Sequence, residues 1–211
     1  MTRHSLLWLL AIISIFLFAP LVVTTSDYEE CIRSEMSESL EWYGDDEATA
    51  ILQRTNRIYS AIMVRSGLDP AIRKHFVKPK PSTEIAPGVE MPKTLTPYAN
   101  HLMDYWANLL TNIWLFCLRL AHSASWIIYL TPFLAATIFD GIMRRKAKLA
   151  SFQYTSPTVY NLSWHVIIAL VACSVVTFAV SMPLSVFVYP VVLTVVGMFV
   201  RLVISNIQHS A

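Results

Sequence analysis

The sequence predicts an all-α membrane protein with four transmembrane helices and with both chain ends in the cytoplasm. Hydrophobic residues make up 55% of its 211 residues and charged residues only 14%, whereas soluble domains carry about 25% charged residues. Four apolar runs are each about 18 residues or longer, which is enough to cross a hydrocarbon core about 30 Å thick. The third observation is a cluster of four cations in residues 144–148, at the end of one of these runs.

The cluster in residues 144–148 predicts the orientation of the chain in the membrane. Lys and Arg beside a span stay on the cytoplasmic side, because they resist transfer across a polarised bilayer. The range from Asp27 to Asp104, by contrast, holds 13 acids and 9 bases, a net charge of −4. We therefore expect a multi-pass protein of the bacterial inner (cytoplasmic) membrane whose main soluble part lies in the periplasm.

Residues 1–25 are predicted to form an N-terminal membrane anchor. The apolar run from Leu6 to Val23 follows Arg3 and is long enough to cross the bilayer. A cleaved signal peptide is the alternative. Because Ala19 is followed by Pro20, which is unfavourable at a cleavage junction, we expect the anchor to be retained.

Residues 26–99 are predicted to be a periplasmic helical segment that ends in a proline-rich linker. The ranges 27–43 and 45–66 suit helices, with Asp45 or Asp46 available as an N-cap. We expect them to form a helical hairpin packed on itself or on the membrane surface. Five prolines between Lys78 and Pro97 prevent regular structure there and predict an extended linker.

Residues 100–122 are predicted to form an amphipathic interfacial helix that lies in the plane of the membrane. Polar residues recur there at helical spacing, and apolar residues fill the opposite face. If this helix crossed the bilayer, the next apolar run would return outward and leave the cations of 144–148 outside. The polar positions are Asp104, Asn108, Thr111, Asn112, Arg119 and His122.

Residues 123–143 are predicted to form the second transmembrane helix. Pro132 lies near its middle and should kink the helix, because proline removes one backbone N–H and clashes with the preceding turn. Asp140 lies four residues before Arg144, the spacing of an ion pair on a helix surface. At the membrane edge we interpret this as a structural pair rather than as a proton site for transport.

The remaining chain is predicted to be a loop, a helical hairpin and a tail. Residues 144–161 form a basic and aromatic cytoplasmic loop. Residues 162–205 form a transmembrane helical hairpin with its turn at Met182 and Pro183, because so short a link forces the two helices to be antiparallel. Residues 206–211 form the cytoplasmic tail.

Sequence motifs of several enzyme classes are absent from the chain. It has no phosphate-binding G-x-x-x-x-G-K-[ST], no H-E-x-x-H, no Cys/His cluster spaced for zinc and no G-x-S-x-G nucleophile elbow. Its three cysteines form no disulfide framework. We therefore expect a protein that is not an enzyme and that has no cofactor, no metal ligands and no catalytic residues.

Residues 144–165 contain the candidate docking residues. Four cations are followed there by four aromatic side chains, a proline and a histidine, an unusual composition for a simple connector. In one interpretation the cations bind anionic lipid headgroups and the aromatic residues belong to the interfacial belt. In the other, the segment is a cytoplasmic docking surface for a partner such as an ATPase, and the two are compatible. The candidate residues are Arg144, Arg145, Lys146, Lys148, Phe152, Tyr154, Pro157, Tyr160, Trp164 and His165.

One pattern in the sequence resembles a known family. It runs from Asp140 to Lys146 and continues through Phe152, Tyr154, Ser156, Pro157 and Tyr160 to Trp164 and His165. It is similar to the TraJ-like conjugal transfer family, small inner-membrane proteins of conjugative plasmids and integrating conjugative elements. The resemblance implies a role in conjugative DNA transfer, a type IV secretion-like process, near the VirD4-like coupling ATPase and the relaxase. The family has no agreed catalytic residues, so none is carried over.

Together these observations favour a non-enzymatic inner-membrane component that scaffolds or stabilises the coupling ATPase of a conjugative DNA-transfer system. The alternative is a subunit of an oligomeric channel or transporter, in which the spans around Pro132 would line a path for water. Other conjugation proteins, or further copies of the chain, are additional candidate partners beside the lipid bilayer. Specific nucleic-acid binding is not expected, because four cations neutralise only a few phosphates.

Overall fold

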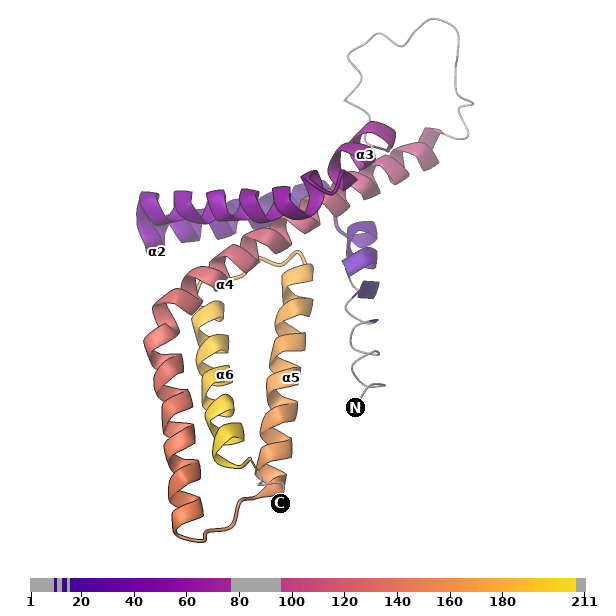
Figure 1. Cartoon of the computed structure of the whole chain (residues 1–211). Coiled ribbons are helices and arrows are strands. Elements are labelled where there is room, and N and C mark those ends of the chain that lie inside the picture. Colours follow the sequence, from indigo (N-terminus) through magenta and orange to yellow (C-terminus); the bar gives the residue numbers. More distant parts are fainter. Residues whose placement is uncertain (1–9, 11–12, 15, 77–95, 208–211) are drawn as a thin grey trace, which may run out of the picture. The chain divides into compact units, whose positions relative to one another are not determined.

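The computed structural model describes residues 10, 13–14, 16–76 and 96–207, and all regular structure in these ranges is helical (Figure 1). The prediction of an all-α protein is therefore confirmed. The elements are α2 (Thr25–Tyr59), the π-helix η1 (Ser60–Val64), α3 (Leu68–His75), α4 (Thr96–Ala150), α5 (Pro157–Ala179) and α6 (Val188–Ser205). The predicted proline-rich linker lies almost entirely outside the described residues.

In the described ranges, three helices are long and apolar enough to cross a membrane, where four were predicted. They are His101–Ala150, Pro157–Ala179 and Val188–Ser205. The anchor predicted for residues 1–25 lies partly outside the described residues, and what is described of its helix ends at Val22. The described residues thus give three candidate spans rather than four, and the predicted anchor, which lies partly outside them, is not among the three.

The chain divides into two compact units. Unit 1 comprises Met1–Ala121 and Phe178–Leu184, and unit 2 comprises His122–Thr177 and Ser185–Ala211. The division falls inside α4, which is one continuous helix where two segments, 100–122 and 123–143, were predicted. Pro132 lies inside this helix, which continues on both sides of it.

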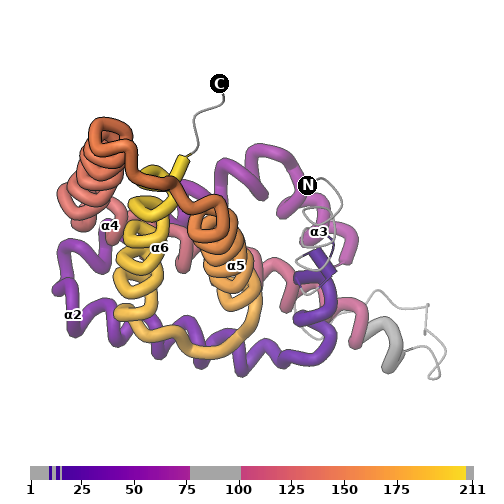
Figure 2. Tube along the Cα trace, turned by 90° about the horizontal axis from the view of Figure 1, so that it is seen from below, coloured from indigo at the N-terminus to yellow at the C-terminus, as the bar shows by residue number. Residues whose placement is uncertain are grey.

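In unit 1, α2 is two helical stretches joined at Gly44, as the sequence predicts for residues 27–43 and 45–66. Gly44 has φ +77° and ψ 175°, and the left-handed φ suits glycine because it has no Cβ. Thr24 caps the first stretch: its hydroxyl accepts from the Asp27 N–H, while the Asp27 carboxylate accepts from the Thr24 N–H. Figure 2 shows the two stretches running in opposite directions from the turn.

The hydrophobic core of unit 1 forms between this hairpin and the first part of α4. Tyr28, Cys31 and Ile51 of α2 pack with Leu115, Leu118 and Ala121 of α4. The polar positions Asn108, Asn112 and Arg119 are also buried. They were predicted to face water at the membrane surface, but protein groups of unit 1 cover them, so this stretch is not a surface helix with a hydrated polar face.

In unit 2, α6 lies between α5 and residues 122–150 of α4 (Figure 1, Figure 2). Two glycines bring α6 and α4 into close contact. A Cβ on Gly197 would lie 3.0 Å from Leu134, and a Cβ on Gly141 would lie 3.1 Å from the Arg201 carbonyl oxygen. His122, predicted on a hydrated face, instead stacks on Tyr189 with ring centroids 5.5 Å apart.

Both predicted connections differ from the structure. The cations of 144–148 lie on α4, which continues to Ala150, so only residues 151–156 link it to α5 and the predicted loop 144–161 is much shorter. Residues 180–187 join α5 to α6, a longer link than the predicted turn at Met182 and Pro183. The carbonyls of this longer link have side-chain partners, described below, that the sequence does not reveal.

Candidate functional site

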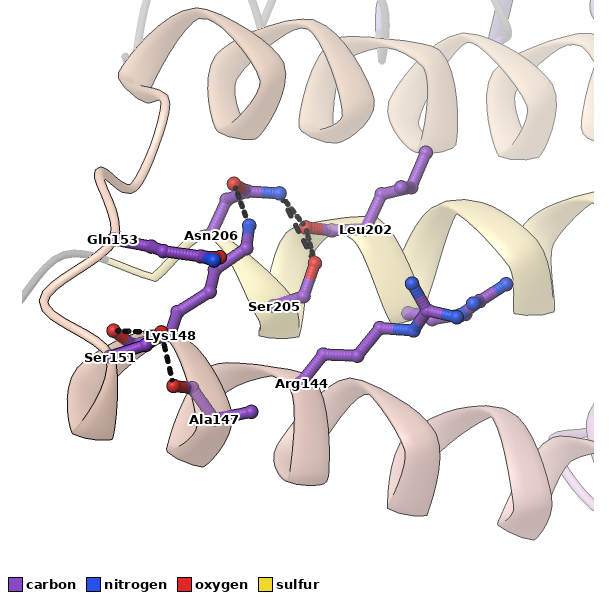
Figure 3. Close-up of a pocket in the computed structure, with 9 residues that line it drawn as sticks. Arg144, Ala147, Lys148, Ser151, Gln153, Leu202, Ser205 and Asn206 are labelled. Carbon is purple, nitrogen blue, oxygen red and sulfur yellow. Dashed lines mark hydrogen bonds between the residues drawn. The ribbon is translucent and has the colours of Figure 1, made fainter.

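A polar pocket lies between the last turns of α4 and α6 in unit 2 (Figure 3). Its volume is about 370 Å³. Because both helices end at this pocket, they run in the same direction. Their last two turns supply Arg144, Lys148 and Arg201. The polar lining includes Arg144, Lys148, Ser151, Gln153, Arg201 and Asn206.

The contact at Gly141 explains why these side chains meet. The missing Cβ lets the Arg201 carbonyl and the Ile204 side chain approach the α4 backbone. A close helix contact of this kind is typical of small residues in membrane helices. It places Arg201 of α6 beside Asp140 and Arg144 of α4, although about 60 residues separate the two helices in sequence.

One carboxylate joins the two helices at this point. Asp140 Oδ2 accepts a hydrogen bond of 2.9 Å from Arg144 Nε and also pairs with Arg201. The structure thus places the predicted Asp140–Arg144 pair one turn apart on α4 and adds a third member from α6. The Arg144 and Arg201 side chains are 58% and 30% exposed, so both remain accessible at the pocket.

Asn206 organises the other side of the pocket. Its Oδ1 accepts from Lys148 Nζ at 2.8 Å and from the Ser156 N–H at 3.4 Å. Its Nδ2 donates to the Leu202 carbonyl at 2.9 Å. Because Asn206 is itself buried, it holds the Lys148 ammonium at a defined position at the edge of the pocket.

The link between α4 and α5 exposes two aromatic side chains. Phe152 is 97% exposed and has a positive φ of 52°, and Tyr154 is 80% exposed. Pro157 is the first residue of α5, where its missing N–H costs nothing. An almost fully exposed Phe at a short link is unusual, because a soluble surface gains nothing from it.

The structure does not gather all ten predicted docking residues. Arg144 and Lys148 line the pocket, while Arg145 and Lys146 of the same helix do not. Phe152 and Tyr154 lie in the link. Tyr160, Trp164 and His165 lie on α5, where Tyr160 is half-buried and the other two are exposed.

Unit 1 contains a second polar site, which is buried. The Arg119 side chain is 0% exposed and that of Glu35 is 2% exposed. Arg119 Nε and Nη2 both donate to Glu35 Oε1, at 3.0 and 2.6 Å. Such two-point contacts between a guanidinium and a carboxylate are among the stronger polar interactions in proteins.

Arg119 also binds the connector between α5 and α6. Its Nη1 donates to the carbonyls of Phe178 and Val180, at 2.9 and 2.6 Å, and its Nη2 donates to that of Met182 at 2.6 Å. Glu35 Oε1 accepts from the Leu184 N–H at 3.1 Å. We name Arg119, Glu35 and residues 178–184 the buried latch.

Burial raises the pKa of the Glu35 carboxyl, and the hydrogen bonds from Arg119 and from the Leu184 N–H oppose this rise. Burial also raises the pKa of the neighbouring Tyr28 hydroxyl to about 12. Because the Arg119 and Glu35 side chains are almost fully buried, the polar groups of the latch depend on one another for hydrogen bonds.

The comparisons with known proteins decide the family. A family model described as IncC plasmid conjugative DNA transfer protein DtrJ-like matches residues 19–210. The chain belongs to the DtrJ-like family. No curated protein and no solved structure matches it. The resemblance to a conjugal-transfer family is thereby confirmed, and the three long apolar helices suggest that this DtrJ-like chain is a membrane protein.

Sequence reasoning missed several residues of both sites in the DtrJ-like chain. Arg201, Asn206 and Glu35 are not among the residues predicted from the sequence. A signal existed for Arg119, because it stands between two leucines in an otherwise apolar stretch. A cation in such a place needs a partner, but its partner Glu35 lies 84 residues away.

The chemistry available to the two DtrJ-like sites differs. The pocket offers accessible cations and hydroxyls, which suit an anionic ligand or surface. The latch offers only groups that already bind one another, which suits a structural role. In the described residues, no group of three or more His, Cys, Asp or Glu side chains is placed to hold a metal ion.

Proposed function

We propose that this DtrJ-like chain is a non-enzymatic, multi-pass component of the bacterial inner membrane that scaffolds or stabilises the coupling ATPase of a conjugative DNA-transfer system. The partner surface is the end of unit 2 formed by the last turns of α4 and by residues 151–156. The proposal includes the predicted orientation, with the cations of 144–148 in the cytoplasm, where an ATP-driven partner is accessible.

The observation that carries the proposal is the concentration of charge and exposed aromatic surface at one end of unit 2. The residues of unit 2 include five Lys or Arg and a single acid, Asp140. Four of these cations fall within the last two turns of α4, directly before the exposed Phe152 and Tyr154. Aromatic and arginine side chains, such as Phe152, Tyr154, Arg144 and Arg145 here, are enriched at protein interfaces.

Co-purification tests the proposal. The tagged full-length chain is extracted in mild detergent from cells that express the transfer system, and recovery of the coupling ATPase is measured. We expect the double variant Phe152→Ala with Tyr154→Ala to lower this recovery about tenfold or more, as loss of an interface anchor does. Conjugation frequency measured in the same strains should fall with it.

Phe139→Ala provides the matched control. Phe139 is an exposed aromatic residue of α4, but it lies in an apolar stretch and outside the proposed surface. We expect its substitution to leave ATPase recovery unchanged. The proposal is wrong if both variants behave alike, or if neutralising Arg144, Arg145, Lys146 and Lys148 together leaves recovery and topology unchanged.

A further inference from the structure

We infer that the pocket between α4 and α6 binds the headgroup phosphate of an anionic phospholipid. The pocket lies in unit 2, is open to solvent, and is lined by Arg144, Lys148 and Arg201. This inference goes beyond the proposed function and does not depend on the coupling ATPase.

The unused donors of the pocket point to an anion. Arg144 and Arg201 each direct Nε to Asp140. For their Nη groups the structure gives no acceptor among the described residues. Lys148 binds the neutral amide of Asn206, so its charge is not compensated there by a carboxylate. Guanidinium and ammonium groups that converge in this way are the usual ligands of phosphate.

The charge of the pocket fits a single phosphodiester. Three cations face one carboxylate, Asp140, and each of the two helix C-termini contributes roughly half a negative charge. The net charge is therefore about +1, which matches the single negative charge of a phosphodiester. Because the helix ends already oppose an anion, a group with a larger negative charge would be less well compensated.

Apolar surface beside the pocket points to a lipid rather than to free phosphate. Met198, Leu202 and Asn206 are each four residues apart on α6 and so lie on one face of the helix. Leu202 lines the pocket, and both Leu202 and Met198 are exposed. On α4, the exposed Met143 lies one turn before Ala147 of the lining. An acyl chain that leaves the pocket therefore finds apolar side chains along both helices.

Basic pockets between membrane helices at the cytoplasmic side are suited to anionic headgroups. Exposed aromatic residues near such a pocket fit the interfacial layer of the bilayer. In this chain, the exposed Phe152 and Tyr154 alternate in sequence with Ser151 and Gln153 of the lining. A pocket at the end of two candidate spans is thus where a headgroup lies when those helices cross the bilayer.

Lipid retention by the full-length protein tests the inference. The protein is reconstituted in nanodiscs of phosphatidylcholine with a minor fraction of phosphatidylglycerol, re-extracted in mild detergent, and analysed by native mass spectrometry. We expect selective retention of phosphatidylglycerol. Lys148→Gln and Arg201→Gln should each lower that retention about tenfold, as loss of a charged hydrogen-bonding group does.

Lys146→Gln provides the matched control. It removes the same charge from the same helix, two residues away, but Lys146 is exposed and does not line the pocket. We expect it to retain the lipid like the unaltered chain, and thermal unfolding must show that all three variants are folded. Equal losses of phosphatidylglycerol from Lys146→Gln and Lys148→Gln would overturn the inference. The lipid would then be held by the general positive charge of this helix end and not by the pocket.

A second experiment distinguishes a lipid headgroup from free inorganic phosphate. Inorganic phosphate at millimolar concentration is added to the lipid-free protein in detergent and to the lipid-loaded protein. We expect it neither to bind measurably nor to displace phosphatidylglycerol. Tight binding of inorganic phosphate alone, or equal retention of phosphatidylcholine, would refute the assignment to an anionic lipid. Neither outcome bears on recovery of the ATPase, so the two proposals fail separately.

Discussion

The buried latch gives the sharpest stability prediction. Replacing Arg119 by Leu removes its hydrogen bonds to the carbonyls of Phe178, Val180 and Met182. It also takes the guanidinium away from the Glu35 carboxylate, which keeps its bond from the Leu184 N–H. Removing one partner of a buried ion pair costs about 3–5 kcal/mol. For a chain of this size, a loss of 1 kcal/mol lowers the melting temperature by roughly 2–4 °C. We therefore expect Arg119→Leu to lower it by roughly 6–20 °C.

The assay is thermal unfolding of the purified protein in detergent, followed by helical circular dichroism. Hydrogen exchange of residues 178–184 gives a local measurement, which should show faster exchange in the variant because the connector loses its anchor. Arg54→Leu is the control. Arg54 pairs with Glu47 at 3.1 Å in the same unit, but its side chain is 33% exposed, so its loss should cost only about 0–1 kcal/mol.

A double variant separates the ion pair from the carbonyl contacts. If the Glu35–Arg119 pair were the whole contribution, replacing both residues by Leu would restore much of the stability, as apolar substitution of buried pairs often does. Here the carbonyls of Phe178, Val180 and Met182 would still lose their bonds from the guanidinium, and a hydrogen bond to a charged group contributes about 1.5–3 kcal/mol. We expect the double variant to remain destabilised. Full recovery in the double variant, or equal melting of Arg119→Leu and Arg54→Leu, would refute this reasoning.

Four further predictions follow from particular residues. Gly44→Ala should lower the free energy of unfolding by about 1–2 kcal/mol, measured by thermal unfolding. The φ of Gly44 is +77° and an added Cβ would meet no atom within 4 Å, so the whole cost is backbone strain. An unchanged melting temperature would contradict the positive φ at this turn. Gly141→Val should separate α4 from α6 and cost about 1–3 kcal/mol, with weaker cross-linking between cysteines introduced on the two helices; unchanged cross-linking would count against their close contact. Burial raises the pKa of the Tyr28 hydroxyl to about 12, from its ordinary value of 10.0. The contribution of this hydroxyl to stability is therefore complete below pH 10.0 and is lost as the pH rises through about 12. Tyr28→Phe should accordingly make the melting temperature depend less on pH above about pH 10. Cysteines placed singly along residues 124–142 should be uniformly protected from a membrane-impermeant thiol reagent, whereas a labelled helical stripe would favour the oligomeric channel.

Much of the fold could be predicted because its signals are local. The sequences of α5 and α6 are apolar over about 20 residues each, so composition alone predicts two adjacent helices of membrane-spanning length. The helical patterns of residues 27–43 and 45–66 predict the hairpin of α2, with Asp45 or Asp46 as the N-cap of the second stretch, and the structure places the turn at Gly44 between them. Four cations after an apolar run predict an electropositive end of unit 2, whatever packs beside it.

The tertiary structure decided what periodicity leaves open. A periodic pattern says which side chains share a helix face, but it does not say what covers that face. Asn108, Asn112 and Arg119 therefore fitted a hydrated surface equally well, and only the packing of α2 shows that they are buried. The pairs Glu35–Arg119 and Asp140–Arg201 join residues far apart in sequence. Such pairs arise from how the helices pack, because side-chain chemistry limits the possible partners without selecting among them.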